Sequence, residues 1–269
     1  MTTSAVELRG VTKRFLTPSG SVFTAICDLD MAIQPGEFCA VVGPTGCGKS
    51  TTLALISGLE PASEGEVTVF GEPVTGIARG IGYVFQTDAV FPWKTVLGNV
   101  AAGPRYSGAS DRDARERARD WISRVGLSGF EDRYPYQLSG GMRKRVALAQ
   151  SLINGPRILL MDEPFSALDV QTRSLMENEL LTLWAASSAS VLFVTHDLEE
   201  AISLSDRVFV ITAGPGTVKS NYKVDLPRPH NVAEIRFEPH FGEIYEEIWN
   251  DLRDEVLVSY ERQKRSGAA

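Results

Sequence analysis

The sequence predicts an α/β fold in which a parallel β-sheet carries a phosphate-binding loop. An apolar run at 38–42 leads into the glycine-rich stretch 43–51, and a helical pattern follows at 51–59. A second apolar run at 158–161 ends in two adjacent acidic residues. Strand patterns on both sides of a largely helical middle block are typical of a parallel-sheet core with a helical insertion.

The glycine-rich stretch fits the pattern G-x-x-x-x-G-K-[ST], with Gly43, Gly48, Lys49 and Ser50 in the fixed places. Glycines let the backbone curve around a phosphate with its N–H groups turned inward, and the start of the next helix adds partial positive charge. Lys49 can reach the β- and γ-phosphates of a nucleotide, and the Ser50 hydroxyl can bind Mg²⁺. The predicted nucleotide-binding residues of this loop are Gly43, Pro44, Thr45, Gly46, Cys47, Gly48, Lys49, Ser50 and Thr51.

Length and composition exclude several classes of protein. The 269 residues allow one large domain or two small ones, and the net charge of −7 argues against a dedicated nucleic-acid-binding protein. No run approaches ~18 consecutive apolar residues, and residues 1–10 lack the pattern of a signal peptide. Cys27, Cys39 and Cys47 form no C-x-x-C pair, which disfavours a disulfide framework or a zinc site. These features predict a cytosolic protein.

Periodicity along the chain places the remaining elements. The predicted strands cover 6–11, 22–33, 38–42, 66–70, 80–86, 157–161 and 191–195. Helical patterns cover 110–125 and 142–153, within a middle block that runs from Asp88 to about Gly155. Near the C-terminus, apolar residues spaced by three and four predict one amphipathic helix over 239–258, which could cover its own core, dimerise or touch a membrane. Its acidic polar face disfavours anionic lipid, so packing on the protein is the favoured interpretation.

Two acids, Asp162 and Glu163, stand at the C-terminal end of a predicted central strand, where ligands bind in α/β proteins. Asp162 is placed to help hold Mg²⁺, and Glu163 is placed to orient or deprotonate an attacking water. The alternative is a strand that runs into an acidic surface turn. Because a phosphate loop precedes these acids in the same chain, the metal-site interpretation is favoured.

A third motif is Leu138–Met142, which opens the helical pattern at 142–153. Ser139 is a good N-cap, and Gly140 and Gly141 expose backbone N–H groups to an anion. One phosphate loop already serves one ATP, so a second anion-binding helix N-terminus is best explained as a site for the γ-phosphate held by another subunit. An ordinary N-cap followed by two loop glycines is the alternative.

The motifs together resemble those of the ATP-binding-cassette ATPases, in the same order and up to about Val210. They are Gly43–Thr51, Gln86, Leu138–Met142, Ile158–Glu163, Ser166–Asp169 and His196. The resemblance implies a P-loop NTPase core around a RecA-like sheet, an N-terminal antiparallel β-subdomain and an inserted helical subdomain at about 88–156. It implies an ATPase domain over 1–216 with a short tail at 217–269. It also implies a homodimer that binds two ATP, with Mg²⁺, head to tail.

The same resemblance assigns individual roles. Phe15 resembles the aromatic residue that stacks on adenine, with a core aromatic as the alternative. Gln86 looks like the residue that contacts Mg²⁺ and the water, Asp169 like the aspartate that closes the dimer, and His196 like the γ-phosphate sensor. The implied catalytic residues are Lys49, Gln86, Glu163 and His196, the implied metal ligands are Ser50, Gln86 and Asp162, and the implied nucleotide contacts outside the loop are Phe15, Ser139, Gly140, Gly141 and Asp169.

Three positions depart from the family pattern or add to it. Met142 ends the signature where many members have Gln, and function should survive because the phosphate contacts come from Ser139 and the glycines. Gln150 stands where an Arg is common. Cys47 lies near a helix N-terminus, which can favour a thiolate, so alkylation of Cys47 is expected to block ATP. The alternative is a small residue that fills space.

Less specific segments of the sequence resemble the ATPase subunits of nitrate, sulfonate and taurine importers. They lie in Phe91–Val100, Leu138–Arg143 and Asp225–Pro229, followed by Arg236. They imply a peripheral protein at the cytoplasmic face of a bacterial inner membrane that powers uptake of a small anion or a related solute. Its partners would be an integral membrane permease, a second ATPase copy and, indirectly, an extracytoplasmic solute-binding protein. The alternatives are an ATPase for lipid or solute export and a soluble cassette ATPase outside transport.

The resemblance also places the surface that couples to the permease around Gln86–Val100. The aromatics Phe91 and Trp93 could form a groove for a partner helix. The alternative is that both simply pack within the helical subdomain.

Overall fold

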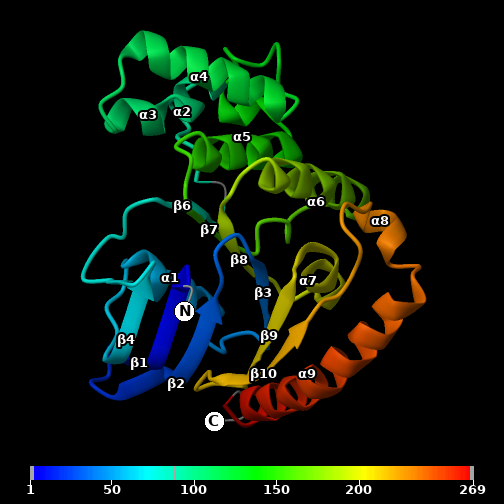
Figure 1. The fold of residues 1–269 in the computed structure, drawn as a ribbon. Coiled ribbons are helices and arrows are strands. Elements are labelled where there is room, and N and C mark those ends of the chain that lie inside the picture. Colours follow the sequence, from blue (N-terminus) through cyan, green and yellow to red (C-terminus); the bar gives the residue numbers. More distant parts are fainter. Residues whose placement is uncertain (1–2, 88, 267–269) are drawn as a thin grey trace. The chain divides into compact units, whose positions relative to one another are not determined.

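The computed structural model describes residues 3–87 and 89–266 (Figure 1). The chain divides into two compact units. The first unit contains Met1–Arg79 and Ser190–Ala269, and the second contains Gly80–Ala189. The predicted domain limits at residues 1, 88 and 269 lie outside the described residues.

An antiparallel sheet opens the first unit, with its strands in the order β2-β1-β4-β5. They are β1 (Val6–Leu16), β2 (Val22–Ile33), β4 (Glu64–Val69) and β5 (Glu72–Pro73). Val6 of β1 lies opposite Ile33 on one side and Val69 on the other. Val6 and Val11 are fully buried and Leu8 is 1% exposed, so one face of this sheet covers a core.

The other strands of the first unit carry the phosphate loop. β3 (Phe38–Val42) pairs in parallel with both β8 (Ser190–Val194) and β9 (Arg207–Ile211), and β10 (Val218–Lys223) pairs antiparallel with β9. Every residue of β3 is buried, as expected for a parallel strand that is covered on both faces. The helices of this unit are α1 (Lys49–Ser57), α7 (Leu198–Leu204), α8 (Val232–Ile235) and α9 (Pro239–Ser266).

Two parallel strands frame the second unit. β6 (Ile81–Val84) pairs with β7 (Ile158–Asp162), with Ile81 opposite Ile158. Parallel neighbours need a crossover connection, and here the connection is a whole helical block. It contains α2 (Val96–Val100), α3 (Ala102–Tyr106), α4 (Asp111–Arg124), the 3₁₀ helix η1 (Pro135–Gln137) and α5 (Gly140–Leu152), and α6 (Val170–Ala185) follows β7.

The helical block of the second unit has its own hydrophobic core. Ala114, Ala118 and Ile122 are fully buried along one face of α4, where they recur every four residues. They join Val146 and Ala149 of α5 in one buried cluster. Each of the two helices contributes both small and branched side chains to this cluster. The block therefore folds around apolar contacts of its own, drawn in green at the top of Figure 1.

The strands and helices agree with the α/β prediction, with differences at the ends of several elements. β1 continues past the predicted 6–11 to Leu16, and α1 spans Lys49–Ser57 rather than 51–59. α5 begins at Gly140 rather than at Met142, because Ser139 caps it there, and α9 continues past residue 258 to Ser266. The elements α6, α7, β9 and β10 carried no prediction of their own. Within residues 3–87 and 89–266, no helix combines the length and the apolar character needed to cross a membrane.

Candidate nucleotide-binding site

The phosphate loop connects the buried strand β3 to α1 in the first unit. Gly48, the N-cap of α1, has φ +101°, a left-handed conformation that glycine adopts without steric cost. A Cβ at Gly43 would lie 2.8 Å from Cys47 Sγ and 3.0 Å from the carbonyl oxygen of Ile211. Only glycine fits this tight loop at those positions, and the resulting cradle of backbone N–H groups fits a phosphate.

Lys49 is enclosed by the loop that it follows. Lys49 is only 7% exposed. Its ammonium donates to the carbonyl oxygens of Gly43 at 2.8 Å and Pro44 at 3.1 Å. A buried cation is costly unless it is hydrogen-bonded, and these carbonyls meet that requirement. The predicted positive charge therefore lies inside the loop, as nucleotide binding requires.

The environment of Cys47 argues against the expected thiolate. Cys47 is 1% exposed, and burial is the main cause that raises the pKa of its thiol, with Lys49 and backbone N–H groups acting in the opposite direction. The helix N-terminus is thus outweighed by desolvation. The alternative, a small residue that fills space beneath the loop, agrees with the close approach of its sulfur to Gly43.

His196 follows β8 and so lies at the same edge of the sheet as the phosphate loop. Val194 of β8 is the register partner of Val41 of β3, and the two strands are parallel. The flanking residues fix this segment: the Thr195 hydroxyl donates to Glu200 at 2.6 Å and accepts from the Asp197 N–H at 3.0 Å. The exposed imidazole of His196 is therefore presented from a well-anchored turn.

Phe15 lies on β1, in the first unit, with a half-buried ring. The ammonium of Lys13 stands 4.7 Å from the centre of this ring, and Lys13 is itself held by an ion pair with Glu60 at 2.8 Å. The ring is neither a fully buried core aromatic nor a loose surface side chain. The predicted stacking on adenine stays a prediction.

The acids of the second unit lie at the end of β7. Asp162 is the last residue of the strand, and Glu163 adopts φ +43°, which is uncommon for a residue with a side chain. Its carboxylate accepts a hydrogen bond from Nε2 of Gln86 at 3.2 Å. The structure thus brings together Gln86 and Glu163, two residues predicted from separate motifs.

Lys144 of α5 supports this pair and carried no sequence prediction. It is 4% exposed, and its ammonium donates to the carbonyl oxygen of Gln86 at 2.6 Å. The signature helix therefore holds the backbone of the residue whose side chain bonds to Glu163. A lysine in the run Arg143–Arg145 looks like part of a solvated basic face, so the sequence offered no signal for this role.

The signature residues form the start of α5. The Ser139 hydroxyl accepts from the Met142 N–H at 3.3 Å, so Ser139 is the N-cap. The helix then begins with Gly140, which is exposed, and Gly141, which is half-buried. Asp169 caps α6 in the same way by accepting from the Thr172 N–H at 3.0 Å, and this hydrogen bond is the main cause that lowers its pKa. Both predicted partner-facing motifs thus present helix N-termini.

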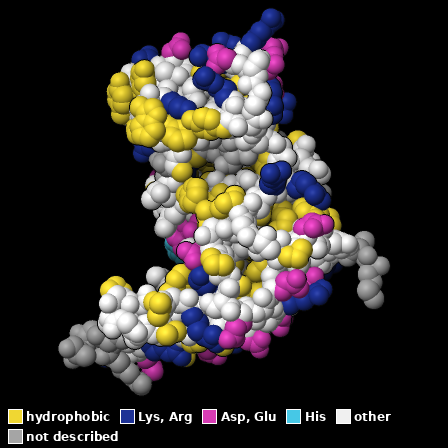
Figure 2. Space-filling model, turned by 90° about the vertical axis from the view of Figure 1, so that its left-hand side faces the viewer, with side chains coloured by type: hydrophobic (Ala, Val, Ile, Leu, Met, Phe, Trp, Pro, Cys, Tyr) yellow, Lys and Arg dark blue, Asp and Glu magenta, His cyan; other side chains and the backbone are white. Residues whose placement is uncertain are grey.

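The predicted coupling segment borders a groove in the second unit. The groove has a volume of about 510 Å³ and is lined in part by Tyr83, Phe85, Phe91, Tyr106, Gln150 and Asn154. Trp93 is 71% exposed, and the centre of its ring lies 5.7 Å from the centre of the Phe91 ring. Trp93 therefore does not pack into the helical core, whereas Phe91 is half-buried. Figure 2 shows hydrophobic side chains gathered on one side of the helical lobe at the top of that view.

Asn99 fixes the shape of the coupling segment. It is fully buried, its Oδ1 accepts from the Phe91 N–H at 2.7 Å, and its Nδ2 lies 3.0–3.1 Å from the carbonyl oxygens of Phe91, Lys94 and Thr95. One buried amide thus organises the whole loop that carries Phe91 and Trp93. Sequence reasoning missed this residue, although an Asn within an apolar helical pattern is a signal for a structural role.

The residues predicted to hold Mg²⁺ have suitable donor chemistry. Ser50, Gln86 and Asp162 offer hydroxyl, amide and carboxylate oxygens, which are hard ligands. Among the described residues, no three His, Cys, Asp or Glu side chains gather into a metal site of their own. Mg²⁺ in nucleotide sites usually takes few protein ligands and fills its shell with phosphate oxygens and water, so the donor set fits.

A parallel sheet with a glycine-rich loop between β3 and α1 defines a P-loop nucleotide-binding protein. The family model described as ABC transporter matches residues 26–166, which cover the phosphate loop, the signature and the acidic strand end. The chain belongs to the ATP-binding-cassette family, and it is an ATPase subunit of that family. The predicted family, fold class and ATPase activity are confirmed.

The chain is similar to several proteins that are named as ATP-binding subunits or cassettes. The nitrate import ATP-binding protein NrtD of Synechocystis sp. is 41% identical over 92% of this chain and 95% of its own. The aliphatic sulfonates import ATP-binding protein SsuB of Bacillus cereus (strain ATCC 10987 / NRS 248) is 37% identical over 96% of each chain. A solved dimeric structure of the ATP-binding cassette MJ0796, in a post-hydrolysis state with ADP and Pi, has a TM-score of 0.73 and 31% identity, and covers 82% of this chain and 100% of its own.

Proposed function

We propose that this ATPase subunit powers the import of a small anion, or of a related solute, into a bacterial cell. The observation that carries the proposal is its similarity, over more than nine-tenths of the chain, to two import ATP-binding proteins, one for nitrate and one for aliphatic sulfonates. The segments Phe91–Val100 and Asp225–Pro229 resemble the same subgroup. In this proposal the permease and the solute-binding protein select the solute, whereas this chain binds and hydrolyses ATP.

In the proposed mechanism, the loop Gly43–Thr51 binds the phosphates of ATP, and Phe15 stacks on adenine. The Lys49 ammonium and the loop N–H groups stabilise the negative charge that develops on the γ-phosphoryl group. Mg²⁺, held by the oxygens of Ser50, Gln86 and Asp162, supplies further charge neutralisation when bound. These residues act mainly through electrostatics and positioning.

Glu163 is the proposed general base. It accepts a proton from the attacking water as the water oxygen bonds to the γ-phosphorus, while the bond from that phosphorus to the bridging oxygen of ADP breaks. The hydrogen bond from Gln86 restricts the Glu163 carboxylate. His196 completes the set as the residue that senses the γ-phosphate.

A second copy of this chain is the proposed partner for closure. Ser139, Gly140 and Gly141 present a capped helix N-terminus that suits the γ-phosphate bound by the other copy. Asp169 contributes at the dimer contact. The dimeric form of the similar cassette MJ0796 supports this arrangement. Hydrolysis weakens the contact to the γ-phosphate, so the dimer closes with ATP and opens after turnover.

A cytoplasmic helix of a membrane permease is the proposed occupant of the groove in the second unit. The groove is lined by aromatic rings and by polar side chains, and the exposed Trp93 lies on the loop that Asn99 organises. An amphipathic helix can place apolar side chains into such a groove. The ATPase is then a peripheral protein on the cytoplasmic face of the inner membrane, and an extracytoplasmic solute-binding protein delivers the cargo to the permease.

The experiment that tests the proposal combines affinity purification with uptake. Tagged protein is isolated from detergent-solubilised membranes, partners are identified by mass spectrometry, and uptake of labelled nitrate and taurine is measured in cells with and without the gene. A co-purified multi-span permease and loss of uptake support import. Loss of efflux instead of uptake would favour the export alternative, and ribosomal partners without a membrane protein would overturn transport and leave the ATPase standing.

A further inference from the structure

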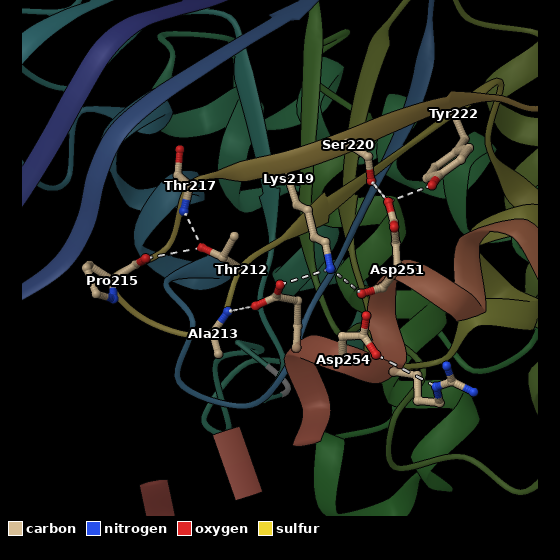
Figure 3. A network of polar contacts seen from close by, with 11 residues as sticks. Thr212, Ala213, Pro215, Thr217, Lys219, Ser220, Tyr222, Asp251 and Asp254 are labelled. Atoms are coloured by element: carbon tan, nitrogen blue, oxygen red, sulfur yellow. Dashed lines mark hydrogen bonds and ion pairs between the residues drawn. The ribbon is translucent and has the colours of Figure 1, made fainter. Parts of the chain in front are cut away.

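Polar side chains of the C-terminal helix α9 bond to the turn at residues 212–217 of the first unit (Figure 3). We call these contacts the grip. The Glu255 carboxylate accepts from the N–H of Ala213 at 2.8 Å and forms an ion pair with Lys219 at 3.1 Å. The Arg262 guanidinium donates to the carbonyl oxygens of Ala213 and Gly214. Both backbone groups of Ala213 are therefore bonded to α9.

A second set of contacts sets the register of α9 on this unit. The Asp251 carboxylate accepts from the hydroxyls of Ser220 at 2.5 Å and Tyr222 at 2.6 Å, both on β10 (Figure 3). On the same helix, Ile248, about one turn earlier, is fully buried, and Leu252, the next residue, is 5% exposed. These polar and apolar contacts keep α9 from sliding, so Glu255 is held beside the turn.

The turn that α9 grips, residues 212–217, is tied into the sheet beside the phosphate loop. The Thr212 hydroxyl accepts from the Thr217 N–H at 3.1 Å and closes the turn (Figure 3). Gly216 donates to the carbonyl oxygen of Ala25 at 2.9 Å and accepts from the Cys27 N–H at 3.0 Å. The turn is thus held on one side by β2 and on the other by α9.

The backbone of the 212–217 turn also touches the backbone of the phosphate loop. A Cβ at Gly216 would lie 2.0 Å from the carbonyl oxygen of Cys47, and one at Gly214 would lie 3.6 Å from that of Gly46. No side chain separates the two backbones at Gly216. Close-packed backbone transmits small displacements directly, so the position of the turn fixes the position of the loop.

We propose that Glu255 and Arg262 are positioning residues for ATP: α9 holds the 212–217 turn, and the turn braces the phosphate loop in its binding conformation. The inference rests on the proposed role of the loop in nucleotide binding. A phosphate loop that is already held in its binding conformation loses less conformational entropy when ATP binds. The contacts with the turn should therefore increase the affinity for ATP. Because neither residue belongs to the proposed catalytic set, kcat should stay unchanged.

The test compares variants of the full-length chain on the same helix. Glu255→Ala and Arg262→Ala each remove one of these contacts between α9 and the turn, and we call them the grip variants. Asp254→Ala and Arg253→Ala are matched controls on the same helix, because those two exposed side chains pair only loosely, at 3.9 Å. We expect the KM for Mg·ATP to rise about fivefold in each grip variant, since each loses a charge-assisted hydrogen bond. The controls and the kcat of all variants stay unchanged, and Arg262→Lys restores most of the affinity.

Hydrogen exchange without nucleotide supplies an independent readout. Peptides that cover the phosphate loop should exchange faster in the grip variants than in the controls, at an unchanged thermal midpoint. An unchanged KM in both grip variants, or an equal rise in the controls, would overturn the inference. Wild-type protein that binds no ATP would overturn the proposed function along with it, whereas equal binding by wild type and grip variants would overturn this inference alone.

Discussion

Gln86 and Glu163 are joined by a hydrogen bond of 3.2 Å from the amide Nε2 to the carboxylate, which links the segment after β6 to the residue after β7. Glu163 has φ +43°, which costs on the order of 1 kcal/mol for a residue with a Cβ. The hydroxyl of Ser166 donates to the Glu163 carbonyl oxygen at 3.0 Å and helps to hold this conformation. The structure thus restrains both the backbone and the side chain of Glu163.

Replacement of Glu163 by Gln tests its role as the general base. The amide keeps the size of the side chain but cannot accept the proton of water, so kcat should fall by roughly 10²- to 10⁴-fold. ATP affinity should persist, because the phosphate loop is untouched. Phosphate release and equilibrium binding of Mg·ATP, measured on the same preparation, check both statements.

Gln86→Ala provides the graded comparison. It leaves the base in place but removes the Gln86 amide, which donates a hydrogen bond to Glu163 and is also a proposed ligand of Mg²⁺. Because the base remains, the loss of kcat should be smaller than in Glu163→Gln. Near-normal turnover by Glu163→Gln would remove Glu163 from the base role. A larger loss in Gln86→Ala than in Glu163→Gln would mean that Gln86 carries the more important contact.

Much of the site was predictable because its residues follow one another in short motifs. The loop Gly43–Thr51 and the pair Asp162 and Glu163 each sit at the end of an apolar strand, and local pattern reveals both. By contrast, Lys144 and Asn99 act by contacts with backbone that is distant or irregular. Such contacts leave no periodic trace in the sequence.

Two elements that carried no prediction, β10 and α6, also depend on tertiary contacts. The strand β10 alternates half-buried and exposed residues and ends a hairpin whose turn is shaped by contacts with α9. The helix α6 has apolar residues on several faces, so its pattern does not indicate one buried side. In both cases tertiary contacts, rather than local preference, decide the structure.

The two glycines of the signature differ in the space around them: a side chain would be crowded at Gly141 but not at Gly140. A Cβ at Gly141 would lie 2.9 Å from Cγ2 of Thr172, whereas the nearest atom to one at Gly140 is 3.9 Å away. Gly141→Ala should therefore lower the free energy of unfolding by about 1–3 kcal/mol, the usual cost of overpacking. Gly140→Ala should leave it unchanged or raise it, because Ala favours a helix. Urea unfolding checks the pair.

A second substitution makes the steric explanation falsifiable. Thr172→Ser removes Cγ2 and keeps the backbone N–H that Asp169 caps. The double variant Gly141→Ala/Thr172→Ser should recover most of the stability lost in Gly141→Ala. If it recovers none, the contact with Thr172 is not the reason for glycine at this position.

Asp251 predicts a pH dependence of stability. Hydrogen bonds from Ser220 and Tyr222 lower the pKa of its carboxyl in the folded state. The folded state therefore binds the proton less readily than the unfolded chain, whose Asp pKa is about 3.9. The stabilisation is fully present above that unfolded value and is lost as pH falls through the folded pKa.

Asp251→Asn should accordingly lower the unfolding free energy by about 1 kcal/mol at neutral pH, the extra strength of a charge-assisted hydrogen bond. The difference from wild type should shrink as the pH is lowered from about 5 to 3. Asp254→Asn, at an exposed position of the same helix, is the control and should be nearly neutral. Urea titrations at several pH values decide the matter, and a difference that persists undiminished in acid would contradict the assignment.

Trp93 separates ATP hydrolysis from its coupling to a membrane partner. Its side chain is 71% exposed beside the groove, and the loop around it is held by Asn99 rather than by the indole. Trp93→Ala should therefore leave thermal stability and ATP affinity unchanged while weakening co-purification of the permease and ATP-driven uptake. Tyr136→Ala is the matched control, because Tyr136 is an aromatic of the same unit that is 79% exposed outside the coupling segment. Normal uptake in Trp93→Ala, or an equal loss in Tyr136→Ala, would place the coupling surface elsewhere.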